Sequence, residues 1–408
     1  MHMPPQSAEG PILEATPEDL VGGLLDVLAL RDWPVPSESF PEGSALVGGA
    51  VRDGLLGRIN GSPDLDLVVP EDALGLTRQL ARRHGGAVVV LDESRDMARL
   101  VVNGWTIDLA RRAGTTLEAD LWRRDYRINA IGLALGARPT LVDPTGGLED
   151  LRNGWVTAIA EENLIADPLR LLRGIRIAAE LRFAIATDTL SLLGQHRALL
   201  PNAAPERIQT EIMKLVRARG ADQALHQLQT TELLQPWGPD AGSDRSVSAE
   251  RLTAAEREEA LPLLRLTRLV SDQGLKDLRC SRRQIRRCLI LRRWQERDDG
   301  HGFSTLSESE RLRLHTELGD DLPALVVQLA PELQDQWLMR WRDPTDPLFH
   351  PQPAIDGTTL QRELGLPSGP RLGQVLKHLA LERAFGRLAT PETALMQARQ
   401  WLHAQPRD

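Results

Sequence analysis

The sequence predicts an α/β domain followed by a long all-helical remainder. Short runs rich in Val and Leu, bounded by Gly, Pro and Asp, recur up to about residue 147 and are typical of strands. From residue 148 onward these runs stop, and apolar residues recur at the spacing of amphipathic helices. At 408 residues the chain is also too long for a single hydrophobic core. We therefore expect several domains.

The predicted elements and domains follow from where these patterns begin and end. Helices are expected at residues 17–31, 71–85 and 116–135. The expected strands lie at residues 44–51, 64–70, 86–92, 99–110 and 139–147. We divide the chain into a loose N-terminus (1–16), an α/β head (17–147) and three helical domains, which are a neck (148–236), a body (237–345) and a tail (346–408).

Composition excludes several classes of protein. The net charge of −8 argues against a large nonspecific nucleic-acid footprint, although it allows a localised one. No apolar run approaches the roughly 20 residues that span a bilayer, and the first ten residues lack the pattern of a secretory signal. Cys280 and Cys288 are too few for a disulfide framework or a four-ligand zinc site. We expect a cytoplasmic protein with reduced thiols and no membrane contact.

The segment LVGGAVRDGLLGR, residues 46–58, is typical of a phosphate-binding turn. An apolar strand runs into Gly48 and Gly49, and a helix is expected to follow. Two glycines let the backbone approach a phosphate closely, the start of a helix favours an anion, and Arg52 can add a charge-assisted contact. A Gly-Gly pair alone is weak, because most isolated pairs are simply tight strand-to-helix turns.

Asp64 and Asp66 strengthen that interpretation. They are two residues apart where an apolar strand begins, so both carboxylates are expected on one face of it. Two such charges repel each other unless a cation lies between them, and Mg²⁺ favours oxygen ligands. Asp108, which closes the apolar run WTIDL, is the natural third carboxylate if its strand pairs with that of Asp64. The alternatives are solvated aspartates on an edge strand and a turn residue at a strand end.

The motifs LVGGAVRD and DLDLVV resemble the signature of the class II tRNA nucleotidyltransferases, which are CCA-adding enzymes, and of the related bacterial poly(A) polymerases. Further blocks that are similar to family segments follow in the family's order. They are LEADLWRRDYRINAIGL (117–133), LVDPTGGLEDLRNG (141–154), ADPLRLLRGIRIAAEL (166–181), PERIQTEIMKLV (205–216) and IDGTTLQRELGLPSGPRLGQVLKHL (355–379). The resemblance covers nearly the whole chain and is weak only around residues 236–345.

The resemblance implies a polymerase-β-like nucleotidyltransferase head with a mixed sheet, followed by helical neck, body and tail domains. It implies template-independent transfer of CMP or AMP from CTP or ATP to the 3′ end of tRNA or another RNA, with release of pyrophosphate. Asp64 and Asp66 would hold two Mg²⁺ ions, one activating the RNA 3′ hydroxyl and one stabilising the leaving group. An obligate protein partner is not implied.

The resemblance also assigns residues to the nucleotide. Arg124, Asp125 and Asn129 would bind the ribose, and a charged helix face is the alternative. Asp167 and Arg170, expected on one helix face, would read the base, and a surface ion pair is the alternative. The full nucleotide-binding set is Gly48, Gly49, Arg52, Arg124, Asp125, Asn129, Asp167, Arg170, Arg173 and Arg176, the last two continuing the arginine row toward triphosphate or RNA.

Three residues depart from the family pattern. Tyr126 replaces a usual Phe, Arg127 replaces a usual Thr and adds a charge that either lies near the nucleotide or points to solvent, and Ala166 replaces a common Glu. A basic stretch in the body predicts contact with RNA phosphates, and a solvated helix face is the alternative. Its members, expected on one broad helical face, are Arg279, Arg282, Arg283, Arg286 and Arg287.

The length of one segment bears on the product. Only residues 109–116 separate Asp108 from the next block, where CCA-adding members usually carry a longer mobile loop and CC-adding members a shortened one. A partial, CC-adding enzyme is therefore one hypothesis. The alternatives are full CCA addition, terminal A addition, a poly(A) polymerase, a catalytically inactive RNA-binding protein, and an antibiotic or protein nucleotidyltransferase. The intact carboxylates and the long helical remainder argue against the last two.

Overall fold

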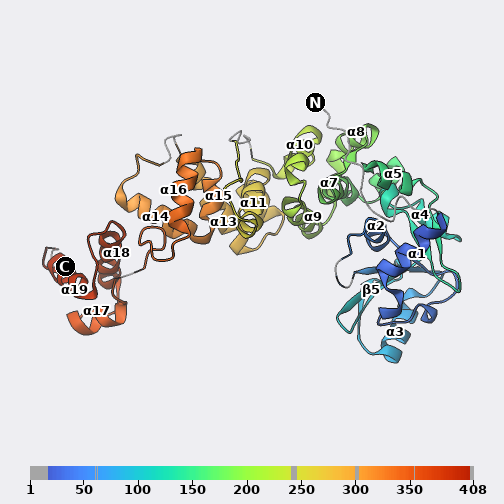
Figure 1. Cartoon of the computed structure of the whole chain (residues 1–408), viewed down its shortest axis with the longest axis horizontal. Coiled ribbons are helices and arrows are strands. Elements are labelled where there is room, and N and C mark those ends of the chain that lie inside the picture. Colours follow the sequence, from blue (N-terminus) through green and yellow to red (C-terminus); the bar gives the residue numbers. More distant parts are fainter. Residues whose placement is uncertain are drawn as a thin grey trace. The chain divides into compact units, whose positions relative to one another are not determined.

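The computed structural model describes residues 17–404 apart from residues 60, 62, 240–245, 299–302 and 353, so the loose N-terminus expected at 1–16 lies outside the described residues. The chain divides into two compact units, residues 1–234 and 235–408. The first contains every strand of the described residues, and the second is helical there. The predicted order of an α/β part followed by helices is confirmed, and Figure 1 shows it along the colour gradient.

The first unit is built on a mixed seven-stranded sheet with the order β3-β4-β5-β2-β1-β6-β7. The β2–β5 pair is parallel, and the other neighbouring pairs are antiparallel. The three residues of β1 are all buried, so the centre of the sheet lies in the core. The strands are β1 (Ala45–Val47), β2 (Leu65–Val69), β3 (Ala87–Asp92), β4 (Met97–Val102), β5 (Trp105–Arg111), β6 (Gly132–Ala134) and β7 (Thr140–Val142).

Three helices accompany the sheet, namely α1 (Pro17–Leu28), α2 (Gly49–Leu55) and α3 (Ala73–His84). Helix α1 packs on α2, and α3 packs on β4 and β5. At Gly54 of α2, an added Cβ would lie only 2.6 Å from Leu24, so glycine allows α1 to approach closely. That contact fixes α2 directly behind the glycine turn.

The helix expected at residues 116–135 is wrong. A short helix, α4 (Leu117–Leu121), is followed by a 3₁₀ turn (Arg127–Asn129) and then by β6. The Asp120 side chain accepts a hydrogen bond from the backbone of Ala113 at 2.8 Å, and β6 pairs with β1. Pairing with a buried strand outweighs the helical propensity of this segment. The Arg124–Asn129 block therefore lies in a turn and not on a helix face.

Strands also occur beyond residue 148, because β8 (Trp155–Val156) pairs in parallel with β9 (Ala184–Ile185). The rest of the first unit is helical as expected. Each of these strands has only two residues, too few to show an alternating pattern, so the sequence does not indicate them. The helices are α5 (Gly147–Asn153), α6 (Glu161–Ala166), α7 (Leu169–Leu181), α8 (Thr187–Gln195), α9 (Pro205–Arg217) and α10 (Ala221–Thr231).

The single helix face expected to carry Asp167 and Arg170 is interrupted. Asp167 is extended, with φ −136° and ψ 95°, and it separates α6 from α7. Pro168 explains the break, because proline disfavours a helical conformation at the preceding residue but fits the start of a new helix. Asp167 therefore stands just before α7, and Arg170 lies in its first turn.

The second unit is a series of helices, several of which begin with side-chain caps. Thr253, Ser281 and Ser307 each form a capping box at the start of a helix. No helix that the structure describes is both long enough and apolar enough to cross a membrane. The helices are α11 (Ala254–Leu269), α12 (Asp272–Asp277), α13 (Arg282–Glu296), α14 (Glu308–Leu318), α15 (Leu322–Val326), α16 (Pro331–Trp341), α17 (Gly357–Leu364), α18 (Pro370–Ala384) and α19 (Pro391–Ala404).

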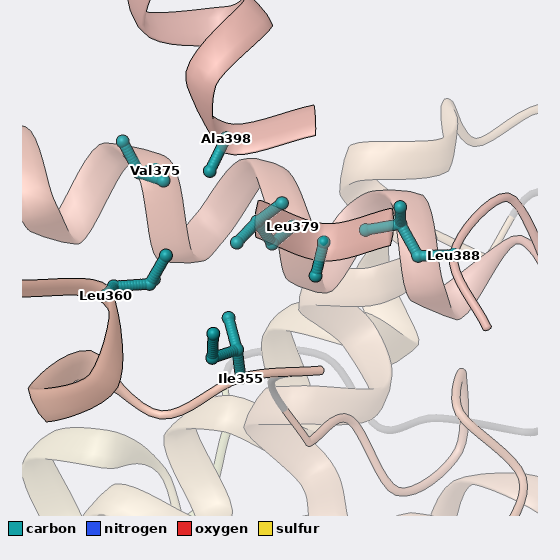
Figure 2. Close-up of a cluster of buried hydrophobic side chains, with 7 residues drawn as sticks. Ile355, Leu360, Val375, Leu379, Leu388 and Ala398 are labelled. Carbon is teal, nitrogen blue, oxygen red and sulfur yellow. The ribbon is translucent and has the colours of Figure 1, made fainter. Parts of the chain in front are cut away.

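The last three helices have a small core of their own. Leu360 from α17, Val375 and Leu379 from α18, and Ala398 from α19 converge there, as Figure 2 shows. Ile355 approaches the same cluster from the segment before α17. Cys280 and Cys288, in the α12–α13 region, are both buried, and neither forms a disulfide within the described residues.

Candidate active site

The glycine turn lies against the carboxylate of Asp66. Gly48 has φ 75°, a conformation that L side chains rarely adopt, and it caps the start of α2. A Cβ on Gly48 would lie 3.2 Å from Asp66 Oδ2 and 3.7 Å from the Arg124 guanidinium. The turn therefore needs glycine both for its backbone angle and for room between these two charged groups.

Asp64 and Asp66 line one cavity of about 590 Å³ together with Gly48 and Gly49. Asp66 lies in β2, next to Val47 of β1, and Asp64 stands one residue before the strand begins. Burial, helped by the nearby charges of Asp108 and Asp64, raises the pKa of Asp66 to about 6. A carboxylate in this position is at a disadvantage when ionised unless a cation is close.

The predicted pairing of the two acidic strands is confirmed, because β5 runs parallel to β2 with Asp108 beside Asp66. Asp108 does not line the cavity, however. Arg99, its cross-strand neighbour on β4, donates two hydrogen bonds to its carboxylate, at 2.7 and 2.9 Å. Asp108 thus adds negative charge behind Asp66 while its own oxygens are bound by Arg99.

A divalent cation fits this donor set. No group of three or more His, Cys, Asp or Glu side chains arranged to hold a metal occurs among the described residues. The protein therefore offers Asp64 and Asp66, both oxygen donors, and leaves the remaining coordination to phosphates and water. That is how hard divalent cations are commonly held beside nucleotides.

A chain of hydrogen bonds joins the glycine turn to α7. Arg52 donates to Asn129 Oδ1 at 2.7 Å and pairs with the neighbouring Asp53. Asn129 Nδ2 donates to Asp125 Oδ1, and Arg173 Nε donates to Asp125 Oδ2 at 2.8 Å. Burial would raise the pKa of Asp125, but the Arg173 charge and the hydrogen bond from Asn129 outweigh it and hold that pKa at about 2. The buried Asp125 is therefore ionised at neutral pH.

Tyr126 fastens the same turn to α7. Its hydroxyl donates to the carbonyl of Arg170 at 2.7 Å. A Cβ at Gly174 would lie 2.1 Å from that hydroxyl oxygen, so glycine in α7 makes room for it. The hydroxyl that distinguishes Tyr126 from the family's usual Phe thus has a defined acceptor. Arg127 does not line the cavity beside the glycine turn and lies near Asp150. Burial raises the pKa of Asp150, and the nearby charge of Arg127 lowers it.

The two residues expected to read the base line a second cavity, of about 960 Å³. Asp167 pairs with Arg207 at 2.9 Å, and Arg170 donates to the backbone carbonyls of Arg123 and Asn163. Ala166 lines this cavity as well, and Arg124 lines both cavities. Arg124 is held by Asp120 at 3.0 Å. The structure therefore brings the ribose and base candidates to adjoining cavities, each with partners in the protein.

Arg173 and Arg176 line the first cavity, but both guanidinium groups are engaged. Arg173 pairs with Asp125, and Arg176 pairs with Glu180 and, at 2.6 Å, with Glu211 of α9. Arg58 and Lys214 also line this cavity and were missed from the sequence. Arg58 ends the glycine-turn segment and Lys214 lies one turn beyond Glu211, so both stood within recognised blocks.

The basic stretch of the second unit only partly forms the expected face. Arg279 has φ 55° and precedes α13, so it is not on the helix. Arg287 donates to both oxygens of Asp321, which removes it from the free surface. Three arginines of this stretch are exposed on α13, namely Arg282, Arg283 and Arg286.

The raised pKa of Asp66 predicts how stability depends on pH in the metal-free protein. An unfolded Asp loses its proton near pH 4, but folded Asp66 keeps it to about pH 6. The stabilising contribution is therefore complete below about pH 4 and is lost as pH rises through 6, a change of up to about 3 kcal/mol. Urea unfolding in EDTA should show this loss for the wild type and not for Asp66→Asn.

The difference in unfolding free energy between the wild type and Asp66→Asn reports on Asp66 alone, because every other titrating group is common to both proteins. Mg²⁺ should restore wild-type stability above pH 6 and leave Asp66→Asn unaffected. Equal pH profiles for wild type and variant would contradict the prediction.

Comparison with known proteins gives two family matches. Residues 44–157 match the family described as "Poly A polymerase head domain". Residues 182–243 match the one described as "Probable RNA and SrmB- binding site of polymerase A". The first match covers the whole seven-stranded sheet, β1 to β7, and includes Asp64 and Asp66.

Several curated relatives are similar over most of their length. The CC-adding tRNA nucleotidyltransferase of Synechocystis sp. is 31% identical, with 88% of this chain and 94% of that protein covered. The A-adding tRNA nucleotidyltransferase of Deinococcus radiodurans is 30% identical, with 91% and 98% covered. The CC-adding tRNA nucleotidyltransferase of Thermus thermophilus is also 30% identical, with 90% and 95% covered.

Solved structures share the fold. The Thermotoga maritima CCA-adding enzyme complexed with tRNA matches with a TM-score of 0.70, covering 98% of this chain and 100% of that chain at 22% identity. A CCA-adding enzyme in complex with CTP also gives 0.70, at 22% identity and 99% coverage of this chain. The predicted fold class is thereby confirmed.

Proposed function

This chain belongs to the tRNA nucleotidyltransferase family, as its motifs indicated, and we propose that it is a CC-adding member. On this proposal it transfers two CMP units from CTP to the 3′ end of tRNA, without a nucleic-acid template, and releases pyrophosphate at each addition. The relatives from Synechocystis sp. and Thermus thermophilus carry that activity in their names.

One observation carries the choice of product, namely the segment of five residues, 112–116, between β5 and α4. It is short and held in place: the backbone N–H of Arg112 donates to the carbonyl of Val69, its side chain donates to the carbonyl of Thr115, and Ala113 N–H donates to Asp120. CCA-adding members of the family usually carry a longer mobile loop at this place, and CC-adding members a shortened one. A tethered segment of this length leaves little chain to rearrange between CTP and ATP.

The proposed nucleotide site follows the two cavities. Gly48, Gly49 and Arg52 face the triphosphate, and Arg124, Asp125 and Asn129 face the ribose, supported by their hydrogen-bonded chain. Asp167 and Arg170 read the base by exchanging their present partners for its polar edge. Arg173 and Arg176 support this site through Asp125 and Glu211.

The proposed cofactor is Mg²⁺, with two ions held by Asp64 and Asp66. When bound, it supplies charge neutralisation and activates the RNA 3′ hydroxyl. The protein's own part is to hold the two carboxylates in place, with Asp108 adding its charge behind Asp66. Since phosphoryl transfer depends on positioning and electrostatics, this arrangement is sufficient without a covalent intermediate.

The helical parts are proposed to hold the RNA. Arg282, Arg283 and Arg286 are exposed on α13 and suit phosphate contacts, with Arg279 nearby and Arg287 held by Asp321. The proposed location is the cytoplasm, where the two buried cysteines stay reduced.

Sequencing the products made from defined tRNA ends tests the proposal. A tRNA lacking its last three nucleotides, given CTP and ATP together, should gain two C residues and stop. A tRNA already ending in CC should remain unchanged with ATP. Efficient terminal A addition would overturn the CC assignment. Extension of general RNA with ATP, with CTP ignored, would instead identify a poly(A) polymerase.

A further inference from the structure

We propose that Arg58 and Lys214 form a binding site for backbone phosphates at the 3′ end of the incoming RNA. The proposal rests on the proposed function, since it names where the acceptor strand of that reaction is held. Both side chains line the same cavity as Asp64 and Asp66, although they come from segments more than 150 residues apart in sequence.

The fold brings the side chains of Arg58 and Lys214 to the same cavity. Arg58 Nη2 donates to the carbonyl of Glu180 at the end of α7, at 3.0 Å. The Glu180 carboxylate pairs with Arg176, which also pairs with Glu211 of α9. Lys214 lies three residues after Glu211, hence on the same face of α9. The ion pairs between α7 and α9 therefore bring Lys214 of α9 to the same cavity as the end of α7, where Arg58 is bound.

Charge pairing separates these two residues from the other basic residues that line the cavity. Each of the others is neutralised by a carboxylate in the protein, as the ion pairs of Arg52, Arg124, Arg173 and Arg176 show. Within the described part of the chain, Arg58 has only a carbonyl acceptor, and no ion pair joins Lys214 to a carboxylate. Their positive charge is thus available to an anion that enters the cavity.

Exposure indicates which anion this is. Arg58 and Lys214 are both exposed, whereas Arg52 is buried and Arg124 is half-buried beside Gly48 and Asp66. The buried groups suit the triphosphate, which must lie at the carboxylates to react. Exposed cations at the solvent side of the cavity suit a long polyanion that approaches from outside, which is the RNA backbone.

A matched control variant tests whether Lys214 has a purely structural role. Lys214 and Arg217 both lie in the last turn of α9, where a cation stabilises the helix dipole. Both are exposed, but only Lys214 lines the cavity. Lys214→Ala and Arg217→Ala therefore remove the same charge from the same helix turn and differ only in proximity to the site.

The test measures RNA binding and turnover separately, with the full chain. The probe is an acceptor-stem minihelix that ends before the CCA sequence, bound in the absence of nucleotide over a range of salt concentrations. Lys214→Ala should weaken binding roughly tenfold. It should also lower the steepness of the logarithmic salt dependence by roughly 0.7, the value for one phosphate contact on a single strand. Lys214→Arg should restore most of the affinity, and Arg217→Ala should match the wild type.

Steady-state kinetics then distinguish the two sources of phosphate. Lys214→Ala and Arg58→Ala should raise KM for the minihelix and leave KM for CTP unchanged. A rise in KM for CTP alone would assign the site to the triphosphate and overturn the proposal, as would RNA affinity equal to that of Arg217→Ala. If the wild type bound the minihelix but added no C residues, the proposed function would fail, and the salt dependence would still decide whether Lys214 contacts RNA.

Discussion

Replacing Asp64 and Asp66 by Asn should abolish nucleotide incorporation, lowering kcat by at least about a thousandfold for the double variant. Both side chains line the cavity beside the glycine turn, and Asp66 lies against Gly48. A divalent cation supplies several kcal/mol of charge stabilisation to phosphoryl transfer, and an amide oxygen without negative charge holds it poorly. Single-turnover incorporation of labelled CMP measures the loss.

The same variants should still bind RNA and fold. Binding of tRNA by the double variant should remain within a few-fold of the wild type, because the phosphate contacts proposed for Lys214 and α13 are untouched. Asp66→Asn should even unfold at higher urea than the wild type above pH 6 without metal, since burial penalises the ionised carboxylate. Incorporation at a wild-type rate would refute the metal-site assignment.

The second large effect is expected at Arg173. Arg173→Ala leaves the Asp125 carboxylate buried without its main counter-charge. Removing one partner of a buried pair is strongly destabilising. We expect a loss of about 2–4 kcal/mol, below the range for a fully buried pair because 37% of the Arg173 side chain is exposed. The shift of the urea unfolding midpoint at constant slope measures it.

The pH dependence tests the cause of that loss. In the wild type, the lowered pKa of Asp125 contributes stability at neutral pH that is lost only as pH falls toward 2. Without Arg173, burial raises that pKa, so Asp125 should be protonated at a higher pH in the variant. Acid should therefore narrow the difference in unfolding free energy between variant and wild type. Arg95→Ala, which breaks an exposed pair with Asp92, should cause no measurable loss. A gap that stays constant with pH would exclude the buried charge as the cause.

Sequence patterns could locate the acidic site because its parts are local. A Gly-Gly turn after an apolar strand and two aspartates at the start of the next strand need only their own spacing to be recognised. The prediction that Asp108 lies beside Asp66 depended on the order of the strands. It is confirmed because β2 and β5 pair in parallel. What the pattern could not show was Arg99, which reaches Asp108 from a third strand.

Of the features that the sequence did not predict correctly, two depend on long-range contacts and one on a local signal. The segment 116–135 has helical spacing, but the addition of β6 to β1 recruits its end into the sheet. The helix expected to carry Asp167 is interrupted at that residue because Pro168 follows it, which is a local signal. Lys214 and Arg58 were not identified, since no spacing rule relates residues that reach one cavity through the packing of α7 on α9 and the contact of Arg58 with the end of α7.

The chain of hydrogen bonds from Arg52 through Asn129 and Asp125 to Arg173, reinforced by the Tyr126 hydroxyl on Arg170, also has a consequence for local opening. Helix α7 cannot detach from the glycine turn without exposing a buried charge and a buried hydroxyl. These elements should therefore open as one cooperative unit, with similar amide-exchange protection on both sides. The proposed nucleotide site therefore lies on a preorganised frame that is expected to open as a whole.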